Sequence, residues 1–507
     1  MTGARARARR TLVIGSGPNG LAAAITLAQA GIEVLVLEAA PVAGGAVASE
    51  DLTLPGFTHD TYSSVYPAAA ASPVFAAMPL ERHGLRWVHP VACYAHPLED
   101  GRGAALYRDL DQTAQSLDAL APGNGDAWRR FVSPWLERFE LLRDTLLGRF
   151  APGRSAVRLA AGLRPRRLAE LGRVALMPVQ ALAAELFADS GARAWLYGSA
   201  MHGDVALGSS GSTLPALFLN LLGHAVGWPS PEGGAGRLAG ALVGYLESLG
   251  GVIRTDAEVV RVLTDGRRTR GVVLADGTRL QAEIVIADVL PGALARLAAA
   301  DLPQRYLAAL RRYRPGPATL KVDWALAGAI PWGSPEARRA GTVHVGGGEE
   351  QMLRCTSPAA ELPERPFMLL GQQSIADTTR APAGRHTAWA YARGPQTADW
   401  PAQTDRHVER MEAEIERFAP GFRDLILARH VLTPAELERR NANLIGGDVG
   451  GGSYSLDQAL LRPVARLVPY RTPVHGLYIA SAATFPGGAV HGAPGRAAAR
   501  LALARRH

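Results

Sequence analysis

The sequence of 507 residues has little cysteine and almost no lysine. Its two cysteines, Cys93 and Cys355, are too few for a disulfide framework or a four-ligand zinc site, so we expect no structural metal and a reducing, cytoplasmic compartment. Lys321 is the single lysine among 54 basic residues. The net charge of +8 is spread along the chain, so no nucleic-acid-binding surface is indicated.

Long apolar runs are missing as well. The longest stretch free of charged residues, Val205–Pro231, is interrupted by glycines and prolines, whereas a membrane-spanning helix needs about 20 mostly apolar residues. The basic opening, Met1–Arg10, precedes an apolar stretch that glycines and a proline cut short, so no secretion signal is expected. With 48% hydrophobic and 20% charged residues, the composition is typical of a globular protein of two or three domains.

One segment, between Arg149 and Arg173, combines arginine and leucine at close spacing. Its basic positions include Arg154, Arg158, Arg164, Arg166 and Arg167, and its apolar positions include Leu159, Leu163, Leu168 and Leu171. A helix of this kind could rest its basic face on anionic lipid. A solvated helix surface explains the same pattern, so peripheral membrane contact is one of two interpretations.

The first 38 residues predict the crossover unit of a parallel sheet. Thr11–Ile14 is a short apolar run, and a glycine-rich turn follows it. Leu21–Ala30 then carries apolar residues at helical spacing, and Glu33–Glu38 is a second strand. A strand, a turn, a helix and a strand in this order build a βαβ unit.

The turn carries the pattern Gly15-x-Gly17-x-x-Gly20, with Pro18 and Asn19 inside it. The first glycine permits a tight turn, the second lets the backbone approach a pyrophosphate, and the third lets helix and strand pack closely. The helix start presents free N–H groups and a partial charge of about +0.5 to the phosphates. Glu38, which closes the second strand, is placed to accept hydrogen bonds from a ribose. The pattern predicts a dinucleotide site.

Two further glycine clusters favour FAD over NAD. Gly44-Gly45 offers a second close backbone approach, which suits a longer cofactor extended across the sheet. Residues 484–495 follow an expected strand and open an expected helix, whose start can stabilise the negative charge that reduction places on a flavin. No second glycine fingerprint stands between a strand and a helix, so electrons are expected to leave to oxygen, a quinone or another acceptor.

Later segments complete the predicted domains. Leu238–Leu249 and Gly495–Ala504 are predicted helices, and Glu283–Ala287 and Gly476–Ala482 are predicted strands. We therefore predict an α/β fold with a Rossmann-type FAD-binding domain assembled from discontinuous segments and a second, mixed α+β substrate domain. The FAD-binding domain is expected to comprise residues 1–75, 229–300 and 441–507, and the substrate domain residues 76–228 and 301–440.

Three of these stretches resemble a known family. They are GSGPNGLAAAITLAQAGIEVLVLEAAPVAGGAVASE, EGGAGRLAGALVGYLESLGGVIRTDAEVVRVL and YRTPVHGLYIASAATFPGGAVHGAPGRAAA. They are similar to the phytoene desaturase-related FAD oxidoreductases of the amine oxidase superfamily. The likeness is greatest to the branch of the pyridine nucleotide-disulfide oxidoreductase domain 2 proteins and the diketolase-type carotenoid ketolases, and it covers about half of the chain.

The resemblance implies cofactor contacts residue by residue. It assigns the pyrophosphate to Gly15, Gly17 and Gly20, the adenosine ribose to Glu38, the adenine to the backbone of Val259, positions beside the cofactor to Gly44 and Gly45, and the isoalloxazine to Gly487, Gly488, Ala489 and Val490. Further cofactor-binding candidates adjoin these positions, namely Pro18, Asn19, Ala39, Ala46, Ser481 and Thr484. The sequence departs from the family where Ala43 and Ala46 replace arginines and Ser481 replaces a glycine, so Ala46 and Ser481 are expected beside the cofactor without the family's usual phosphate and ribityl contacts.

The catalytic candidates are Lys321 and His491. The resemblance places Lys321 where some amine oxidases have a lysine that contacts flavin N5 through water, and an exposed lysine at a strand end is the alternative. His491 could donate to the flavin or a substrate, or it could cap or pack its helix. The candidates for substrate binding are Tyr62, Tyr66, Phe218 and Leu222. Ordinary packing in a loop or core is the alternative for these four.

The expected activity follows from the cofactor and the resemblance. The motifs Gly-x-Ser-x-Gly, His-Glu-x-x-His and Cys-x-x-Cys are missing, so neither hydrolase nor zinc chemistry is indicated. We expect an FAD-dependent oxidoreductase that dehydrogenates a lipophilic polyene or isoprenoid-like substrate by hydride transfer to N5. The alternatives are an amine or alcohol oxidase of a natural-product intermediate, a redox-neutral flavin isomerase and a non-catalytic flavoprotein.

Overall fold

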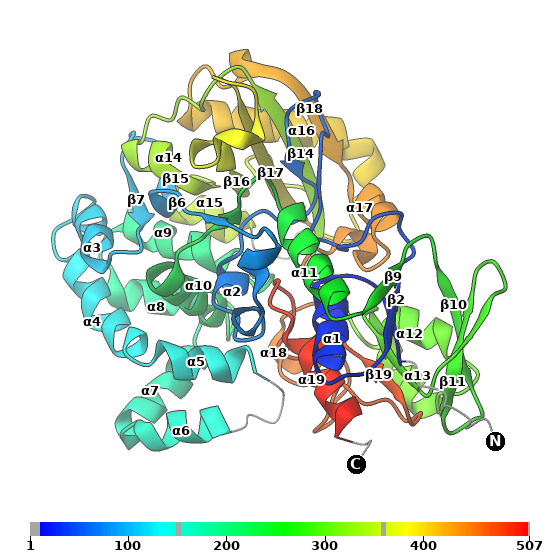
Figure 1. Ribbon diagram of the computed structural model, residues 1–507. Helices are drawn as coiled ribbons and strands as arrows, with labels where there is room; N and C mark the ends of the chain where they lie inside the picture. Colours follow the sequence, from blue (N-terminus) through cyan, green and yellow to red (C-terminus); the bar gives the residue numbers. More distant parts are fainter. Residues whose placement is uncertain (1–10, 149–153, 356–360, 505–507) are drawn as a thin grey trace, which may run out of the picture.

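The computed structural model describes residues 11–148, 154–355 and 361–504. Two large sheets organise the chain, one with five strands and one with seven. In Figure 1 the five-stranded sheet lies at the right, and a broad layer of helices beside the seven-stranded sheet lies at the left. The basic opening, Met1–Arg10, lies outside the described residues.

The five-stranded sheet is parallel throughout, in the order β19-β13-β1-β2-β9. Its strands are β1 (Thr11–Ile14), β2 (Val34–Leu37), β9 (Val252–Arg254), β13 (Ile284–Ala287) and β19 (Leu477–Ile479). Thr11 is in register with both Val34 and Ile284. Aliphatic residues fill the central strands, and every residue of β1, β2 and β13 is buried, as expected of a parallel sheet covered on both faces.

Helices and a small antiparallel ribbon cover this sheet. The helices are α1 (Pro18–Gln29), α11 (Gly236–Ser248), α12 (Pro291–Leu297), α13 (Gln304–Arg311) and α19 (Ala493–Leu503), and the ribbon is β10 (Val259–Thr264), β11 (Thr269–Leu274) and β12 (Arg279–Gln281). Val13 packs with α1, α11 and α19, while Leu12 packs with α12, α13 and the ribbon. Neighbouring residues of β1 thus belong to different cores, because successive strand side chains point to opposite faces.

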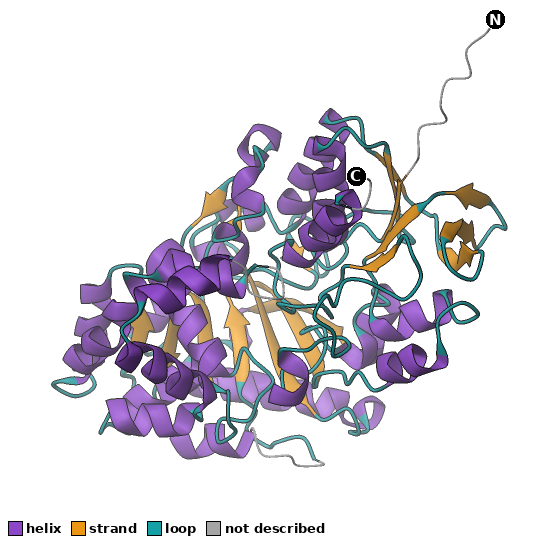
Figure 2. Cartoon of the chain, turned by 90° about the horizontal axis from the view of Figure 1, so that it is seen from below, coloured by secondary structure: helices purple, strands orange, loops and turns teal. Residues whose placement is uncertain are grey.

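The seven-stranded sheet has the order β18-β14-β17-β16-β15-β6-β7 and is antiparallel except between β15 and β6. Its strands are β6 (Ala92–Pro97), β7 (Gly103–Leu106), β14 (Ala318–Leu326), β15 (Ala340–Val345), β16 (Met368–Gly371), β17 (His386–Gly394) and β18 (Ile426–Leu432). Its outer face, with Val322 and Trp324, packs on α16 (Trp400–Phe418). Figure 2 shows helices on both sides of this sheet.

The remaining elements surround these sheets. The helices are α2 (Pro67–Ala70), α3 (Leu110–Asp118), α4 (Asn124–Leu136), α5 (Phe139–Leu146), α6 (Arg154–Gly162), α7 (Pro165–Leu176), α8 (Val179–Leu186), α9 (Ser190–Ala200), α10 (Thr213–Val226), α14 (Pro335–Arg339), α15 (Glu349–Cys355), α17 (Pro434–Arg440) and α18 (Leu456–Ala459). The short strands are β3 (Ser49–Glu50), β4 (His59–Asp60), β5 (Trp87–Val88) and β8 (Ser230–Pro231). Helices α3 to α5 and α8 to α10 contribute to the core on the inner face of the seven-stranded sheet.

The predicted elements differ from the observed ones mainly at their ends. Helix α1 begins at Pro18 instead of Leu21, because proline fits the first turn of a helix. Strand β19 ends at Ile479 instead of Ala482, since the chain then turns and the Thr484 N–H bonds to the Ser481 carbonyl at 2.9 Å. The strands of each large sheet come from the segments predicted for its domain, and the domain boundaries themselves stay a prediction.

No helix in the described part of the chain is long and apolar enough to cross a bilayer. The uncharged run Val205–Pro231 contains helix α10, which begins only at Thr213 and packs between other helices. Within the described part of the arginine-rich segment, Arg154–Gly162 forms α6 and Pro165–Leu176 forms α7, and both helices project at the lower left of Figure 1. The first residue of this segment, Arg149, lies outside the described residues.

Gly495 makes the contact between α1 and α19 possible, and it provides a test of the fold. A Cβ at this position would lie 1.8 Å from the Asn19 carbonyl oxygen, so we expect Gly495→Ala to lower the free energy of unfolding by about 1–3 kcal/mol or more. The control is Gly240→Ala in the middle of α11, where no neighbour lies within 4 Å. That change is expected to stabilise the protein by about 0.5–1 kcal/mol. Urea unfolding measures both, and equal effects would contradict the packing.

Candidate functional site

The glycines of the turn between β1 and α1 lie where the backbone leaves no space for a larger side chain. Gly15 has a φ of +90°, and a Cβ on Gly20 would lie 2.1 Å from the Gly15 carbonyl oxygen. Pro18 occupies the first turn of α1, where no N–H is required. Asn19 is buried, and its Oδ1 has no hydrogen-bond partner. The turn has the tight glycine conformation with which a helix N-terminus approaches a pyrophosphate.

Ser16 connects this turn to the two other predicted cofactor segments. Its hydroxyl donates to Glu38 Oε2 at 2.5 Å and accepts from the Gly44 N–H at 3.1 Å. A Cβ on Gly45 would lie 2.8 Å from the Gly17 Cα, so the double glycine packs directly against the turn. Sequence reasoning missed Ser16, although its place between two fingerprint glycines marked it.

The segment predicted to contact the adenine of the cofactor lies beside Glu38. The Ala257 N–H donates to the Glu38 carbonyl oxygen at 2.8 Å, which brings the segment before Val259 to the end of β2. Ala39 is exposed and Ala46 is half-buried, so both are accessible next to this end of the sheet.

Asp288 is a buried carboxyl group that sequence reasoning missed. It follows β13, and its Oδ2 accepts the Gly20 N–H at 2.8 Å. A Cβ on Gly17 would lie 2.9 Å from the same oxygen. Burial, together with the negative charge of Glu38, raises the pKa of Asp288 to about 7, although the bond from Gly20 opposes this. Partial protonation near neutral pH weakens the repulsion between this carboxyl group and a pyrophosphate.

The predicted flavin segment forms a loop between β19 and α19. Gly487 has a φ of +118° and Ala489 one of +71°, while the Ala489 side chain is exposed. The Gly488 N–H donates to the Tyr454 hydroxyl. Ser481 and Thr484 are buried and bond within the turn, where the Thr484 hydroxyl donates to the Ser481 carbonyl at 2.8 Å. We call residues 483–490 the flavin loop.

His491 caps its own turn. Its Nδ1 accepts the Ala493 N–H at 3.2 Å, so Nε2 carries the proton and donates to the Gly488 carbonyl at 3.1 Å. Burial lowers the pKa of His491 to about 4, which keeps the ring neutral. Both ring nitrogens are thus engaged within the loop, and this geometry corresponds to the capping alternative instead of donation to a flavin or substrate.

Lys321 is buried in the middle of β14, and so it is not the exposed lysine of the alternative interpretation. Its Nζ donates to Asp323 Oδ1 at 2.5 Å, and both side chains are at most 3% exposed. His59 Nδ1 lies 3.5 Å from the same carboxylate, and its Nε2 lies 2.7 Å from the Thr53 hydroxyl. Burial alone would raise the pKa of Asp323, but the Lys321 charge and His59 outweigh it and lower that pKa.

Two aromatic side chains share the inner sheet face with this pair. In register, Tyr391 lies opposite Lys321 and Trp389 lies opposite Asp323. The two rings stack with centroids 5.8 Å apart and planes 7° from parallel. We call these four residues the inner-face group. Sequence reasoning missed the aromatic pair, because nothing in an isolated strand shows which residues face it.

The start of β14, next to the inner-face group, is connected to the flavin loop through a glycine segment. Thr319, two residues before Lys321 on the same face, lies next to Gly447, since a Cβ there would be 3.3 Å from the Thr319 nitrogen. The glycine segment that follows meets the loop, because a Cβ on Gly488 would lie 2.2 Å from the Gly450 carbonyl oxygen. One continuous set of contacts therefore joins β14 to the flavin loop.

The four predicted substrate-binding residues have different environments. Tyr62 is half-buried against Leu432 and its neighbours, and burial raises its pKa to about 12. Phe218 is half-buried on α10. Tyr66, 2% exposed, and Leu222, fully buried, belong to the apolar cores instead, so the structure supports the packing alternative for these two.

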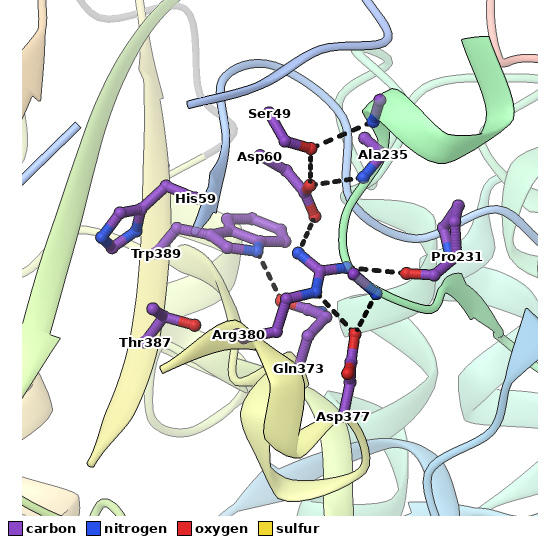
Figure 3. Close-up of polar contacts among 12 residues, drawn as sticks. Ser49, His59, Asp60, Pro231, Ala235, Gln373, Asp377, Arg380, Thr387 and Trp389 are labelled. Atoms are coloured by element: carbon purple, nitrogen blue, oxygen red, sulfur yellow. Dashed lines mark hydrogen bonds and ion pairs between the residues drawn. The ribbon is translucent and has the colours of Figure 1, made fainter. Parts of the chain in front are cut away.

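A buried arginine joins the two sheet-centred halves, as Figure 3 shows. Arg380, 2% exposed, donates to Asp60 at 2.8 Å and to Asp377 at 2.7 Å. Asp60 also accepts the Ala235 N–H at 2.6 Å, and Asp377 accepts the Gly233 N–H at 2.8 Å. These bonds fix the hairpin after the double glycine and the segment before α11 to the loop between β16 and β17.

The raised pKa of Asp288 predicts a pH-dependent stability. The folded protein keeps this proton up to about pH 7, whereas the unfolded chain loses it near the ordinary value of 3.8, so stability falls as pH rises across that interval. Asp288→Asn removes the titration, and we expect it to be the more stable protein in alkaline buffer by up to about 4 kcal/mol, with the advantage vanishing in acid. Urea unfolding of cofactor-free protein against pH measures this. Asp276→Asn, at an exposed turn, is the control, and parallel pH profiles for wild type and Asp288→Asn would contradict the assignment.

Comparison with known proteins agrees with this geometry. Residues 19–503 match the model of the flavin-containing amine oxidoreductase family. The chain is 28% identical to the pyridine nucleotide-disulfide oxidoreductase domain-containing protein 2 of Rattus norvegicus, over 97% of this chain and 92% of that one. It is 27% identical to the all-trans-zeta-carotene desaturase of Myxococcus xanthus, over 94% and 90% of the two chains. Its fold is similar to that of an oxidoreductase from Methanosarcina mazei, with a TM-score of 0.66, 17% identity and coverage of 97% and 99%.

The residues present fit a flavin dinucleotide. The glycines at positions 15, 17 and 20 put no side chain between the turn and a pyrophosphate, Glu38 lies at the end of β2 beside the turn, where a ribose is expected, and the flavin loop presents Ala489 at its surface. The cofactor is therefore FAD and the protein is an FAD-dependent oxidoreductase, as the sequence predicts. Because the family match extends over nearly all of the sequence, the chain belongs to the flavin-containing amine oxidoreductase family.

Proposed function

We propose that the protein desaturates a lipophilic polyene or isoprenoid-like molecule. Desaturation removes two hydrogens from neighbouring carbons, one as a hydride that bound FAD accepts at N5 and one as a proton that leaves to water or a protein group. The electron pair then passes to an acceptor, for which we propose oxygen or a quinone. The observation that carries the proposal is the inner-face group, in which stacked aromatic rings flank one buried ion pair.

The aromatic pair suits a flat, conjugated chain. Trp389 and Tyr391 are half-buried with nearly parallel planes, and a polyene gains both apolar burial and offset stacking against such surfaces. Phe218 extends the apolar surroundings on α10. The similarity to a zeta-carotene desaturase supports the same class of substrate.

Lys321 is the proposed catalytic residue of this group. Asp323 holds the ammonium in one place, so the lysine can orient a water molecule without moving its own charge. His59 and Thr53 in turn hold Asp323 from the hairpin that follows the double glycine. We assign no catalytic role to His491, because its ring nitrogens are used within the flavin loop.

An anaerobic reduction experiment tests the proposal. Carotenoid polyenes in detergent are expected to bleach the flavin absorbance of the holoprotein, whereas primary amines leave it yellow. Lys321→Met is expected to retain the flavin and to slow bleaching by about 10²-fold, the usual effect of losing a group that positions a transferred proton. Arg429→Met is the control, because this cation lies on the neighbouring strand β18 and pairs with Glu412 on the outer face.

Other outcomes of the anaerobic reduction experiment would favour other functions. Bleaching by amines, followed by peroxide formation in air, would identify an amine oxidase. A holoprotein that no polyene, alcohol or amine reduces would contradict the desaturase proposal and favour an isomerase or a non-catalytic flavoprotein.

We also propose that α6 and α7 contact a membrane surface from which a lipophilic substrate is drawn. Arg158, Arg164, Arg166 and Arg167 are exposed on these helices. Leu176, 60% exposed, lies next to a second group of exposed leucines, since its carbonyl accepts the Gly211 N–H and Gly211 contacts Leu456. These leucines are Leu456, Leu460 and Leu461. Exposed leucines beside arginines suit the boundary of an anionic bilayer.

Flotation with liposomes that contain anionic lipid tests this contact. Changing Arg158, Arg164, Arg166 and Arg167 to Ser is expected to reduce binding strongly, because each basic residue near an anionic surface contributes about 1 kcal/mol. The control changes four exposed arginines of the β10–β12 ribbon, at the opposite side of Figure 1, by the same charge. These are Arg261, Arg267, Arg268 and Arg279. Equal loss in both variants, or none in either, would discard the proposed surface.

A further inference from the structure

Arg462 is a completely buried cation behind the flavin loop. Its side chain is 0% exposed. Nη2 donates to the Tyr313 hydroxyl and to the Gly451 carbonyl, both at 2.5 Å, and Nε donates to the Ala483 carbonyl at 3.3 Å. Nη1 is buried without a hydrogen-bond partner. The guanidinium is thus held firmly on one side and left unsatisfied on the other.

The unsatisfied side faces the flavin loop. A Cβ on Gly487 would lie 2.9 Å from Nη1, so the glycine backbone passes directly over this nitrogen. The guanidinium carbon lies 4.6 Å from the centre of the Tyr454 ring, and the Tyr454 hydroxyl accepts the Gly488 N–H. Arg462 therefore touches the loop at Ala483 and Gly487, and at Gly488 through Tyr454.

No carboxylate among the described residues forms an ion pair with Arg462. Its direct partners are the carbonyl oxygens of Gly451, Gly452 and Ala483 and the Tyr313 phenol, all neutral. The Asp204 carboxylate interacts with Arg462 only electrostatically, without a direct contact. It accepts a hydrogen bond from the Tyr454 N–H at 2.9 Å. The contrast with Arg380 is direct, because that equally buried arginine has two carboxylates within 2.8 Å. A buried cation is normally paired with a negatively charged group. Arg462 has no such ion-pair partner among the described residues.

We propose that Arg462 stabilises the negative charge that two-electron reduction places on the flavin held by the loop. A fixed cation in a water-free environment acts strongly on charge that develops nearby and needs no reorganisation to do so. The charge therefore raises the reduction potential of the bound cofactor. It also favours the reduced flavin that has gained two electrons and one proton over the form that has gained two electrons and two protons. The proposal needs the FAD but not the polyene, so it survives if the substrate class is wrong.

Measurements on the substrate-free holoprotein test the role of the charge. Arg462→Gln is expected to lower affinity for sulfite, an anion that adds to oxidised flavin at N5, by about tenfold or more, since removing one stabilising donor commonly has an effect of this size. The midpoint potential should fall in parallel, by about 30 mV for each tenfold change of a two-electron equilibrium. Arg462→Lys keeps the charge and is expected to retain most of both properties.

Two control variants separate charge from loop packing. Tyr313→Phe removes a hydroxyl that holds Nη2 but leaves the charge, so the potential should stay unchanged. Arg466→Gln removes an exposed arginine of the same segment, which stacks on Tyr306 at 5.5 Å much as Arg462 stacks on Tyr454. Its charge is screened by water, so it should change neither sulfite affinity nor potential.

The wild-type protein supplies a test that does not depend on a variant folding. In mildly acidic buffer, where free FAD takes up two protons on reduction, the bound cofactor is expected to take up one, which halves the pH slope of its potential to about 30 mV per unit. A slope equal to that of free FAD would overturn the proposal. So would an unchanged potential in Arg462→Gln that retains its flavin, which would leave Arg462 as a loop anchor only.

Discussion

The structure depends on backbone contacts that only glycine permits around the turn between β1 and α1. Gly20 lies against the Gly15 carbonyl, Gly45 against Gly17, and Gly495 against the Asn19 carbonyl. These glycines come from the beginning, the following loop and the end of the chain. Because no side chain separates them, these segments meet around one dinucleotide site, and the hydrogen bonds of Ser16 with Glu38 and Gly44 fix the first two segments to each other.

The sequence predicted this part of the fold well because its signals are local. Apolar periodicity and glycine spacing located β1, α1 and β2 to within a few residues. The polar groups that define the site could not be predicted from the sequence in the same way. Asp288 binds Gly20 across 268 positions of sequence, and Arg462 meets Gly487 only through tertiary packing. Neither residue stands in a pattern of its own, so no spacing rule could have identified it.

The same reason explains the mixed outcome for the candidate side chains. Lys321 was singled out because it is the only lysine, yet its environment depends on Asp323, His59 and the strand that places Tyr391 beside it. His491 was singled out by its place before a helix, and the structure shows both of its nitrogens engaged in that turn. A residue type suggests a chemistry, but its hydrogen-bond partners decide whether the group is free to perform it.

The order of segments in the five-stranded sheet bears on how the protein is made. Strand β19, the flavin loop and α19 come late in the sequence, while α1, against which α19 packs, comes early. During synthesis on the ribosome, the first βαβ unit is made long before β9 and β13, the strands that flank it in the sheet. Until then the outer edges of β1 and β2 lack their partner strands, and FAD can meet its complete set of binding segments only after α19 has been made.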